Sequence, residues 1–242
     1  MRVLGIDTSS LPAGVALAED DRLLGEYYIQ YKKTHSQTLM PMLQDMAQML
    51  ELDMTSIQAV AIAAGPGSFT GLRIGSATAK GLGLALDIPL VEVSTLEGMA
   101  YNLWGCSGLI CPMMDARRQQ TYTALYRFED GLPHEVLAPC AVSVKEIIDT
   151  LNRQGESVCF LGDGVPVFAD YIRDSCRVPY RFAPAHLNRQ RASSIAVLGM
   201  EYYRAGRFVP AAAHKPEYLR LSQAERERAE RERMNESVSR NG

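Results

Sequence analysis

The chain has 242 residues, of which 47% are hydrophobic and 22% charged, and its formal net charge is −3. This length suffices for one large domain or two small ones, and the composition is that of a globular protein. The slight negative charge provides no overall positive field for nucleic acids or membranes. No apolar run approaches the roughly eighteen residues that a membrane-spanning helix needs.

The N-terminus and the cysteines favour a cytosolic protein with reduced thiols. Asp7 lies inside what would be the apolar core of a signal peptide, which argues against such a peptide. The five cysteines are odd in number and widely scattered, so they predict no disulfide framework.

The first half of the chain predicts three strands, a helix, a strand, a glycine-rich turn and a second helix. Alternating apolar residues indicate the strands, and apolar residues three and four apart indicate the helices. Ser36 or Thr38 is expected to cap the first helix, and Ser94 with Glu97 forms a capping box for a third. In chain order we expect strands at 3–6, 14–20 and 23–31, a helix at 34–52, a strand at 57–64, a helix ending near 86, a strand at 89–94 and a helix at 94–103.

The second half repeats this order. Even the aspartate at the end of the opening strand recurs, as Asp7 and then Asp115. Ser143 and Glu146 form a second capping box. We expect strands at 108–117, 120–128 and 134–142, a helix from 143 to about 153, a strand at 157–162, a turn at 162–164 and a helix at 165–175. The repetition predicts an α/β protein whose two similar halves face each other across a cleft, with lobes at 1–104 and 105–221.

The stretch "GPGSFTG" at 65–71 follows a strand and precedes a helix. Its backbone N–H groups suit an anion at a helix N-terminus, yet it matches neither the P-loop nor the dinucleotide fingerprint. A tight turn that merely delivers the helix explains the glycines equally well. "DTSS" at 7–10 and "GDG" at 162–164 have the same two interpretations, a ligand contact or a plain turn. The candidate nucleotide contacts are Asp7, Thr8, Ser9, Gly65, Gly67, Ser68, Gly71, Gly162, Asp163 and Gly164.

The sequence contains no motif for a metal site or for a catalytic nucleophile. The four histidines lie far apart, and Cys106 and Cys111 have no second ligand pair, so we expect no metal site and buried thiols instead. Ser68 lacks the flanking glycines of a nucleophile elbow, although a pairing with His35 stays open.

The helix after the glycine stretch carries two rows of small residues. One row contains Gly71, Gly75, Ala79 and Gly83, and the other Ala77, Gly81 and Ala85. Small residues at this spacing let another backbone approach, and each glycine inside a helix costs about 1 kcal/mol relative to alanine. Packing on the chain's own sheet accounts for one row, and the second favours a partner. The methionine-rich face of helix 34–52 fits either a partner surface or an ordinary core.

The last segment, 222–242, is rich in arginine and glutamate and nearly without apolar residues. Such a composition offers no face to bury, so we expect a charged, disordered tail.

Several of these motifs together resemble the TsaB (YeaZ) family. They are "LGIDTS", "THSQTLMPML", "GPGSFTGLRIG" with "AKGLGLAL", "VSTLEGMA" and "MDARRQQTYTALY". The resemblance covers about the first 130 residues and continues more loosely to "PEYLRLSQAE". It implies the duplicated actin/sugar-kinase/Hsp70-like fold, which is also ribonuclease H-like. It further implies a role in forming threonylcarbamoyladenosine next to the tRNA anticodon.

The same resemblance implies a subunit without catalytic residues. The catalytic subunit TsaD, a relative of the same fold, has an H-x-x-x-H pair shortly after its own glycine loop and helix. Aligning "STLEGMA" with that segment places Thr95 and Met99 at the two histidines, and neither replaces an imidazole ligand. A glycoprotease-like metallopeptidase meets the same objection. The alternative is a nucleotide-hydrolysing or kinase-like enzyme that uses Asp7, Thr8 and the glycine stretch.

In the family, the first two helices dock against the matching helices of TsaD. Carried over to this sequence, the expected interface residues are Ser36, Leu39, Met42, Leu43, Met46, Arg73, Ser76, Ala77 and Lys80. The implied partners are TsaD in a heterodimer, TsaE in the full assembly, and tRNA indirectly through the complex. A homodimer is expected when TsaD is absent. The resemblance implies no resident cofactor and leaves ATP or ADP binding at the complex open.

Overall fold

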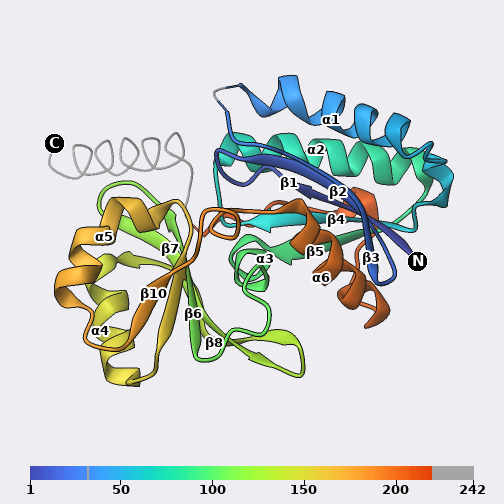
Figure 1. Cartoon of the computed structure of the whole chain (residues 1–242). Helices are drawn as coiled ribbons and strands as arrows, with labels where there is room; N and C mark the ends of the chain where they lie inside the picture. Colours follow the sequence, from blue (N-terminus) through green and yellow to red (C-terminus); the bar gives the residue numbers. More distant parts are fainter. Residues whose placement is uncertain (32, 220–242) are drawn as a thin grey trace, which may run out of the picture.

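The computed structural model describes residues 1–31 and 33–219, so the charged segment 222–242 lies outside the described residues. The chain forms two lobes, each built on a five-stranded sheet (Figure 1). The first sheet contains β1 (Arg2–Asp7), β2 (Ala13–Glu19), β3 (Arg22–Ile29), β4 (Ala59–Gly65) and β5 (Leu90–Ser94). The second contains β6 (Leu109–Asp115), β7 (Gln120–Glu129), β8 (Leu132–Ser143), β9 (Val158–Leu161) and β10 (Tyr180–Phe182).

The two sheets have the same topology. The strand orders are β3-β2-β1-β4-β5 and β10-β9-β6-β7-β8. Read from its other edge, the second order is β8-β7-β6-β9-β10, which corresponds strand by strand to the first. In each sheet the first three strands pair antiparallel, and the last two run parallel to the first. The predicted duplication is confirmed, including the aspartate that ends both β1 and β6.

Within the described residues, six α-helices cover the sheets: α1 (His35–Met49), α2 (Phe69–Leu86), α3 (Thr95–Tyr101), α4 (Val144–Gln154), α5 (Gly164–Ser175) and α6 (Ala192–Arg204). Helices α1 and α2 pack on one face of the first sheet, and α4 and α5 on one face of the second (Figure 1). Helix α3 contacts strands of both sheets. Within 1–31 and 33–219, no helix combines the length and the apolar character needed to cross a membrane.

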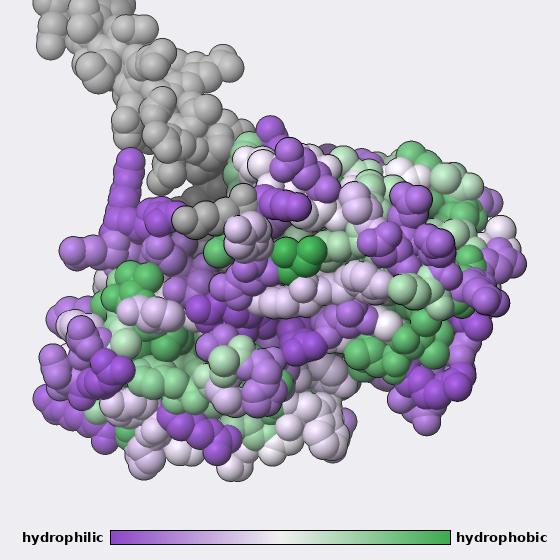
Figure 2. Space-filling view, turned by 45° about the horizontal axis from the view of Figure 1, so that its top comes forward, coloured by the Kyte–Doolittle hydropathy of each residue, from purple (hydrophilic) through white to green (hydrophobic). Residues whose placement is uncertain are grey.

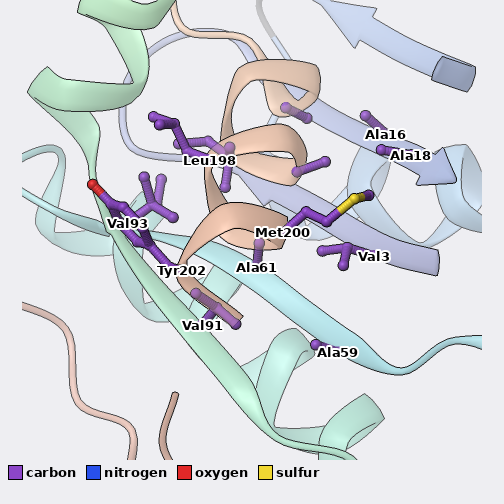
Figure 3. Packing of buried hydrophobic residues seen from close by; sticks show 14 residues of the cluster. Val3, Ala16, Ala18, Ala59, Ala61, Val91, Val93, Leu198, Met200 and Tyr202 are labelled. Atoms are coloured by element: carbon purple, nitrogen blue, oxygen red, sulfur yellow. The ribbon is translucent and has the colours of Figure 1, made fainter. Parts of the chain in front are cut away.

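Helix α6 and the short strand β10 were not predicted from the sequence. Helix α6 follows the second sheet in the chain and falls in the range 105–221, yet it packs against β1, β2 and β4 of the first sheet. Figure 3 shows Leu198, Met200 and Tyr202 of α6 beside Val3, Ala61 and Val91. The expected second lobe therefore does not include α6, because its apolar face completes the core of the first lobe.

Helix capping agrees with the sequence at one of the two predicted boxes. The amide of Glu146 donates to Ser143 Oγ at 3.3 Å, and Ser143 Oγ donates to the Glu146 carboxylate at 3.0 Å. At α3 the predicted box is absent: Glu97 instead accepts a hydrogen bond from the hydroxyl of Tyr202 in α6. The predicted cap of α1 is also wrong, because the helix begins at His35, so that Ser36 and Thr38 lie inside it.

Two glycines in helices provide a matched test of this packing. A Cβ at Gly199 would lie 2.3 Å from Cβ of Ala61, whereas a Cβ at Gly81 would meet nothing within 4 Å. Gly199→Ala should therefore lower the free energy of unfolding by about 1–3 kcal/mol through overpacking. Gly81→Ala should raise it by up to about 1 kcal/mol through helix propensity. Urea unfolding measures both changes, and equal changes at the two positions would contradict the described fit of α6.

Candidate functional site

A cleft of about 660 Å³ lies between the lobes. The first lobe supplies residues of the β1–β2 turn, the segment before α1 and the start of α2, and the second supplies residues that follow β6 and β9. Glu217, Tyr218 and Leu219 return to its rim from the end of the described chain. Figure 2 shows hydrophilic residues along the junction between the lobes. The duplicated topology explains this position, since the carboxyl ends of β1 and β6 both point toward it.

The β1–β2 turn uses its polar groups on its own chain. The Asp7 carboxylate accepts hydrogen bonds from the amide of Ser9 at 2.9 Å and from its hydroxyl at 2.7 Å. Thr8 Oγ1 donates to the carbonyl of Gly71 in α2 at 2.8 Å. Asp7, Thr8 and Ser9 are all buried, and burial raises the pKa of Asp7 from 3.8 to about 6 against the opposing effect of the Ser9 bonds. These polar groups of the turn thus have hydrogen-bond partners within the chain, and their role is structural.

The glycines at the start of α2 face this turn. A Cβ at Gly71 would lie 2.1 Å from the carbonyl oxygen of Thr8, and one at Gly67 would lie 2.3 Å from that of Ser9. The amide of Ser68 donates to the Ser9 carbonyl at 2.6 Å, and Ser68 Oγ accepts from the amide of Gly71 at 3.3 Å. The glycines are therefore required by close packing of the chain on itself, and two of the loop amides are already bonded.

Two further glycines, one in each lobe, also lie against backbone. Gly65 ends β4 and Gly162 directly follows β9, and their φ values are +134° and +113°. A Cβ at Gly65 would lie 2.2 Å from the Glu217 carbonyl, and one at Gly162 would lie 2.0 Å from the Met113 carbonyl. A Cβ at Gly164 would lie 3.1 Å from the Met113 backbone. Close backbone approach, in a conformation that L side chains rarely adopt, explains Gly65 and Gly162.

One hydrogen bond joins the lobes across the floor of the cleft. Ser10 Oγ donates to Asp163 Oδ2 at 2.9 Å. Burial raises the pKa of Asp163, and the Ser10 bond opposes that rise. The carbonyl of Ser10 is also bonded to His35 Nε2 at 2.7 Å, and Ser68 caps α2, so Ser68 and His35 are not a nucleophile–base pair. Ser10 belongs to the predicted "DTSS" turn but was not among the candidate contacts, and the rim residues Glu217 and Tyr218 were not predicted as site residues.

The candidates for metal binding do not gather. The described residues contain no group of three or more His, Cys, Asp or Glu side chains that could hold a metal ion. Thr95 and Met99 are buried in α3. Of the two thiols predicted to be buried, Cys111 is buried, but the prediction is wrong for Cys106, which is partly exposed and whose sulfur lies 2.9 Å from Arg181 Nη2.

The predicted partner residues differ in how deeply they are buried. Leu39, Met42, Leu43 and Met46 fill the core between α1 and the first sheet, so they do not form a free surface. Ser76 is buried and bonded to His214 at 2.9 Å. The ammonium group of Lys80 donates to the carbonyls of Ala212 and His214. Leu39, Met42, Leu43, Met46 and Ser76 are thus buried within this chain, Lys80 is half-buried, and Ser36, Arg73 and Ala77 are exposed. The partner interface itself stays a prediction.

The exposed face of the two helices consists of other residues. The row Gly71, Gly75, Ala79 and Gly83 is buried on the sheet, as expected for one of the two rows. The row Ala77, Gly81 and Ala85 faces solvent, together with Leu84, which is 62% exposed. On α1 the exposed apolar side chains are Met40 and Met49, at 50% and 79%.

Two duplicated α/β lobes around a cleft define a protein of the actin/sugar-kinase/Hsp70-like class. YeaZ from Pseudomonas aeruginosa has this fold, with a TM-score of 0.77 at 24% identity over 90% of this chain and 99% of that one. A family model described as "TsaD: tRNA N6-adenosine threonylcarbamoyltransferase" matches residues 23–228.

Full-length relatives narrow this class to one family. The chain is 36% identical over 227 residues to the tRNA threonylcarbamoyladenosine biosynthesis protein TsaB of Bacillus subtilis, covering 93% of this chain and 96% of the relative. Identity to the Escherichia coli protein of the same name is 29% over 91% and 95% of the two chains. The chain belongs to the TsaB family and contains the TsaD-type domain.

The fold class raises the question of a nucleotide in the cleft, and the first-lobe loop does not fit one. A phosphate cradle needs free backbone amides and open space beside its glycines. Here the carbonyls of Thr8 and Ser9 occupy that space, and the amide of Ser68 is bonded to Ser9. Gly67, Ser68 and Gly71 therefore serve packing between the β1–β2 turn and α2. Asp163 lines the cleft, and its Oδ1 is buried without a hydrogen-bond partner among the described residues.

The buried Asp7 predicts a specific pH dependence of stability. Its folded-state pKa is raised to about 6, so its contribution is complete below the ordinary pKa of 3.8 and is lost as pH rises through 6. Relative to Asp7→Asn, the native chain should lose about 2 kcal/mol of unfolding free energy between pH 4.5 and 7.5. Chemical denaturation at both pH values measures this difference.

Asp53→Asn is the control of opposite sign. Asp53 is exposed, and hydrogen bonds from Thr55 lower its pKa, so its contribution is lost on acidification instead. A parallel pH profile for the native chain and Asp7→Asn would show that Asp7 is not a buried ionisable group.

Proposed function

We propose that this chain is a non-catalytic subunit that binds TsaD through the exposed face of α1 and α2. In this proposal, binding biases TsaD toward its competent conformation for forming threonylcarbamoyladenosine in tRNA. A partner can shift such an equilibrium only by contacting one conformation better than the other. The family supports the link to this pathway, since its curated members are named as biosynthesis proteins for this modification.

Gly81 carries the proposal. It lies in the middle of α2, where glycine costs about 1 kcal/mol relative to alanine. The fold gives no reason for it, since a Cβ there would meet nothing within 4 Å. Gly71, Gly75 and Gly83 differ, because a Cβ at any of them would lie within 2.5 Å of another atom of the chain. An exposed glycine flanked by Ala77 and Ala85 suits the close approach of a second helix.

The surroundings of Gly81 agree with a docking surface for a helix. Leu84 of α2 and Met40 and Met49 of α1 expose half or more of their accessible surface. Methionine and leucine side chains adapt to an apolar partner. The charged head of Lys80 is turned to the carbonyls of residues 212 and 214, which leaves the centre of this face without a free cation.

The cleft supports the non-catalytic part of the proposal. A nucleotide-hydrolysing or kinase-like enzyme, the alternative from sequence, needs phosphate contacts that Thr8 and Ser9 occupy with their own backbone. A metallopeptidase needs ligands where Thr95 and Met99 are buried. The remaining elements of the proposal are cytoplasmic localisation, TsaE as a further subunit, and a homodimer through the same helices when TsaD is absent.

The test is complex formation with TsaD of the same organism. The double variant Ala77→Arg/Gly81→Leu should weaken the complex at least tenfold and abolish tRNA modification on reconstitution, because both changes fill the space for the approaching helix. Val167→Arg on α5, where Val167 is 57% exposed, is the matched control and should bind normally. Titration calorimetry and sizing measure binding, and thermal unfolding confirms that each variant is folded.

A full-strength complex of the double variant would contradict the proposed face. No complex of the native chain at any concentration would contradict the proposed function itself.

A further inference from the structure

The two lobes use equivalent turns differently. In the first lobe the turn after Asp7 is buried against the glycine face of α2. In the second lobe the glycine at the start of α5, Gly164, approaches the Met113–Met114 backbone of β6. The turn after Asp115 is not covered in this way: Arg117 lines the cleft, and Arg118 and Gln119 beside it in the chain are exposed.

This second turn has an unfavourable backbone. Arg117, Arg118 and Gln119 have φ values of +62°, +53° and +58°, three consecutive side-chain-bearing residues in the left-handed region. Such conformations are disfavoured for L residues and persist where the surroundings impose them or function requires them. Here the amide of Arg117 donates to Asp115 Oδ1 at 2.8 Å, and the side chain of Arg117 stays 88% exposed. The conformation thus directs three donor side chains into solvent.

Further cations lie at the same rim. Lys33 lines the cleft from the segment before α1, and Arg73 is exposed on the second turn of α2. Within the described ranges, Lys33, Arg73 and Arg118 form no salt bridge with a carboxylate. Arg117 has one, with Asp115 at 3.3 Å. Four basic side chains therefore lie at or beside this rim, against the carboxylates of Asp115 and Glu217 in the same lining.

Two aromatic rings accompany these cations. Phe69 and Tyr218 lie with their ring centroids 4.6 Å apart, and the Arg73 guanidinium lies 3.9 Å from the centroid of Phe69. Tyr218 is 38% exposed. Arginines that contact phosphates beside an aromatic platform that stacks an unpaired base are the usual means of recognising single-stranded RNA loops.

We propose that this rim, formed by Lys33, Phe69, Arg73, Arg117, Arg118 and Tyr218, binds tRNA directly at an unpaired loop. Arg117 and Arg118 hold phosphodiester groups, and the exposed face of Tyr218 stacks a base. The proposal rests on the tRNA part of the proposed function and not on activation of TsaD. It replaces the expected indirect contact, through the complex, with a surface on this chain.

The test measures binding of the full chain, without TsaD, to an in vitro transcribed tRNA by fluorescence anisotropy over a range of salt concentrations. Each phosphate contact contributes about 0.7 to the slope of log K against log salt for a single strand. Arg117→Ala/Arg118→Ala should lower that slope by about 1.5 and weaken binding about 30-fold at 0.1 M salt. Tyr218→Ala should weaken binding about tenfold and leave the slope unchanged.

Two further double variants distinguish this role from a general effect of positive charge and from a loss of folding. Arg153→Ala/Arg173→Ala removes the same charge from exposed positions on α4 and α5, including an arginine paired with Asp170 as Arg117 is with Asp115, and should bind like the native chain. Arg117→Lys/Arg118→Lys should restore the salt slope.

Several outcomes would overturn the proposal. They are failure of the native chain to bind tRNA at 50 mM salt, and equal loss in the rim and control doubles. Loss of TsaD binding with unchanged tRNA binding would also overturn it, because the rim would then be a protein contact. The TsaD complex test uses other residues, so the two proposals can fail independently.

Discussion

The approach of the Thr8 and Ser9 carbonyls to the glycine face of α2 fixes the geometry of the first lobe. A side chain at Gly67 or Gly71 would lie less than 2.5 Å from these oxygens. Only glycine permits this distance, so the start of α2 is held against the β1–β2 turn. That contact also sets the rotation of α2, because Gly71 and Gly75 must face Thr8. The opposite row, with Gly81, then faces solvent.

Hydrophobic periodicity was sufficient to predict the duplicated architecture. Alternation and helical spacing are local properties, and they identified β1 to β9 and α1 to α5 close to their observed positions. The capping box at Ser143 formed because its helix end is solvent-exposed, whereas Glu97 at the other box found a competing partner in Tyr202. That partner is 105 residues away, in a helix that local pattern did not assign to the first lobe. Tertiary contacts of this kind determine which of two equally favourable capping sequences forms its capping box.

The two faces of α1 show where prediction from composition ends. Its methionines lie on both sides: Met42 and Met46 are buried in the core, and Met40 and Met49 are exposed. Hydrophobicity alone does not distinguish the two sides, so the buried side was predicted as the partner surface. In α2 the two rows of small residues were visible in the sequence, but which row met the sheet depended on the position of Thr8. The same limit applies to the cleft, whose lining joins residues from Ser9 to Leu219.

Helix α2 belongs to both candidate surfaces. Its first turns, to Ile74, line the cleft, and Ala77 onward forms the exposed face. A partner bound at Gly81 cannot slide or rotate α2 alone, since the carbonyls of Thr8 and Ser9 already lie against its glycines. A close-packed core transmits a displacement of one element to the elements packed against it. Helix α2 and the β1–β2 turn are therefore one packed unit, which the Ser10–Asp163 hydrogen bond connects to the second lobe. In the proposed complex, a partner bound at Gly81 would contact the same packed unit that carries Arg73.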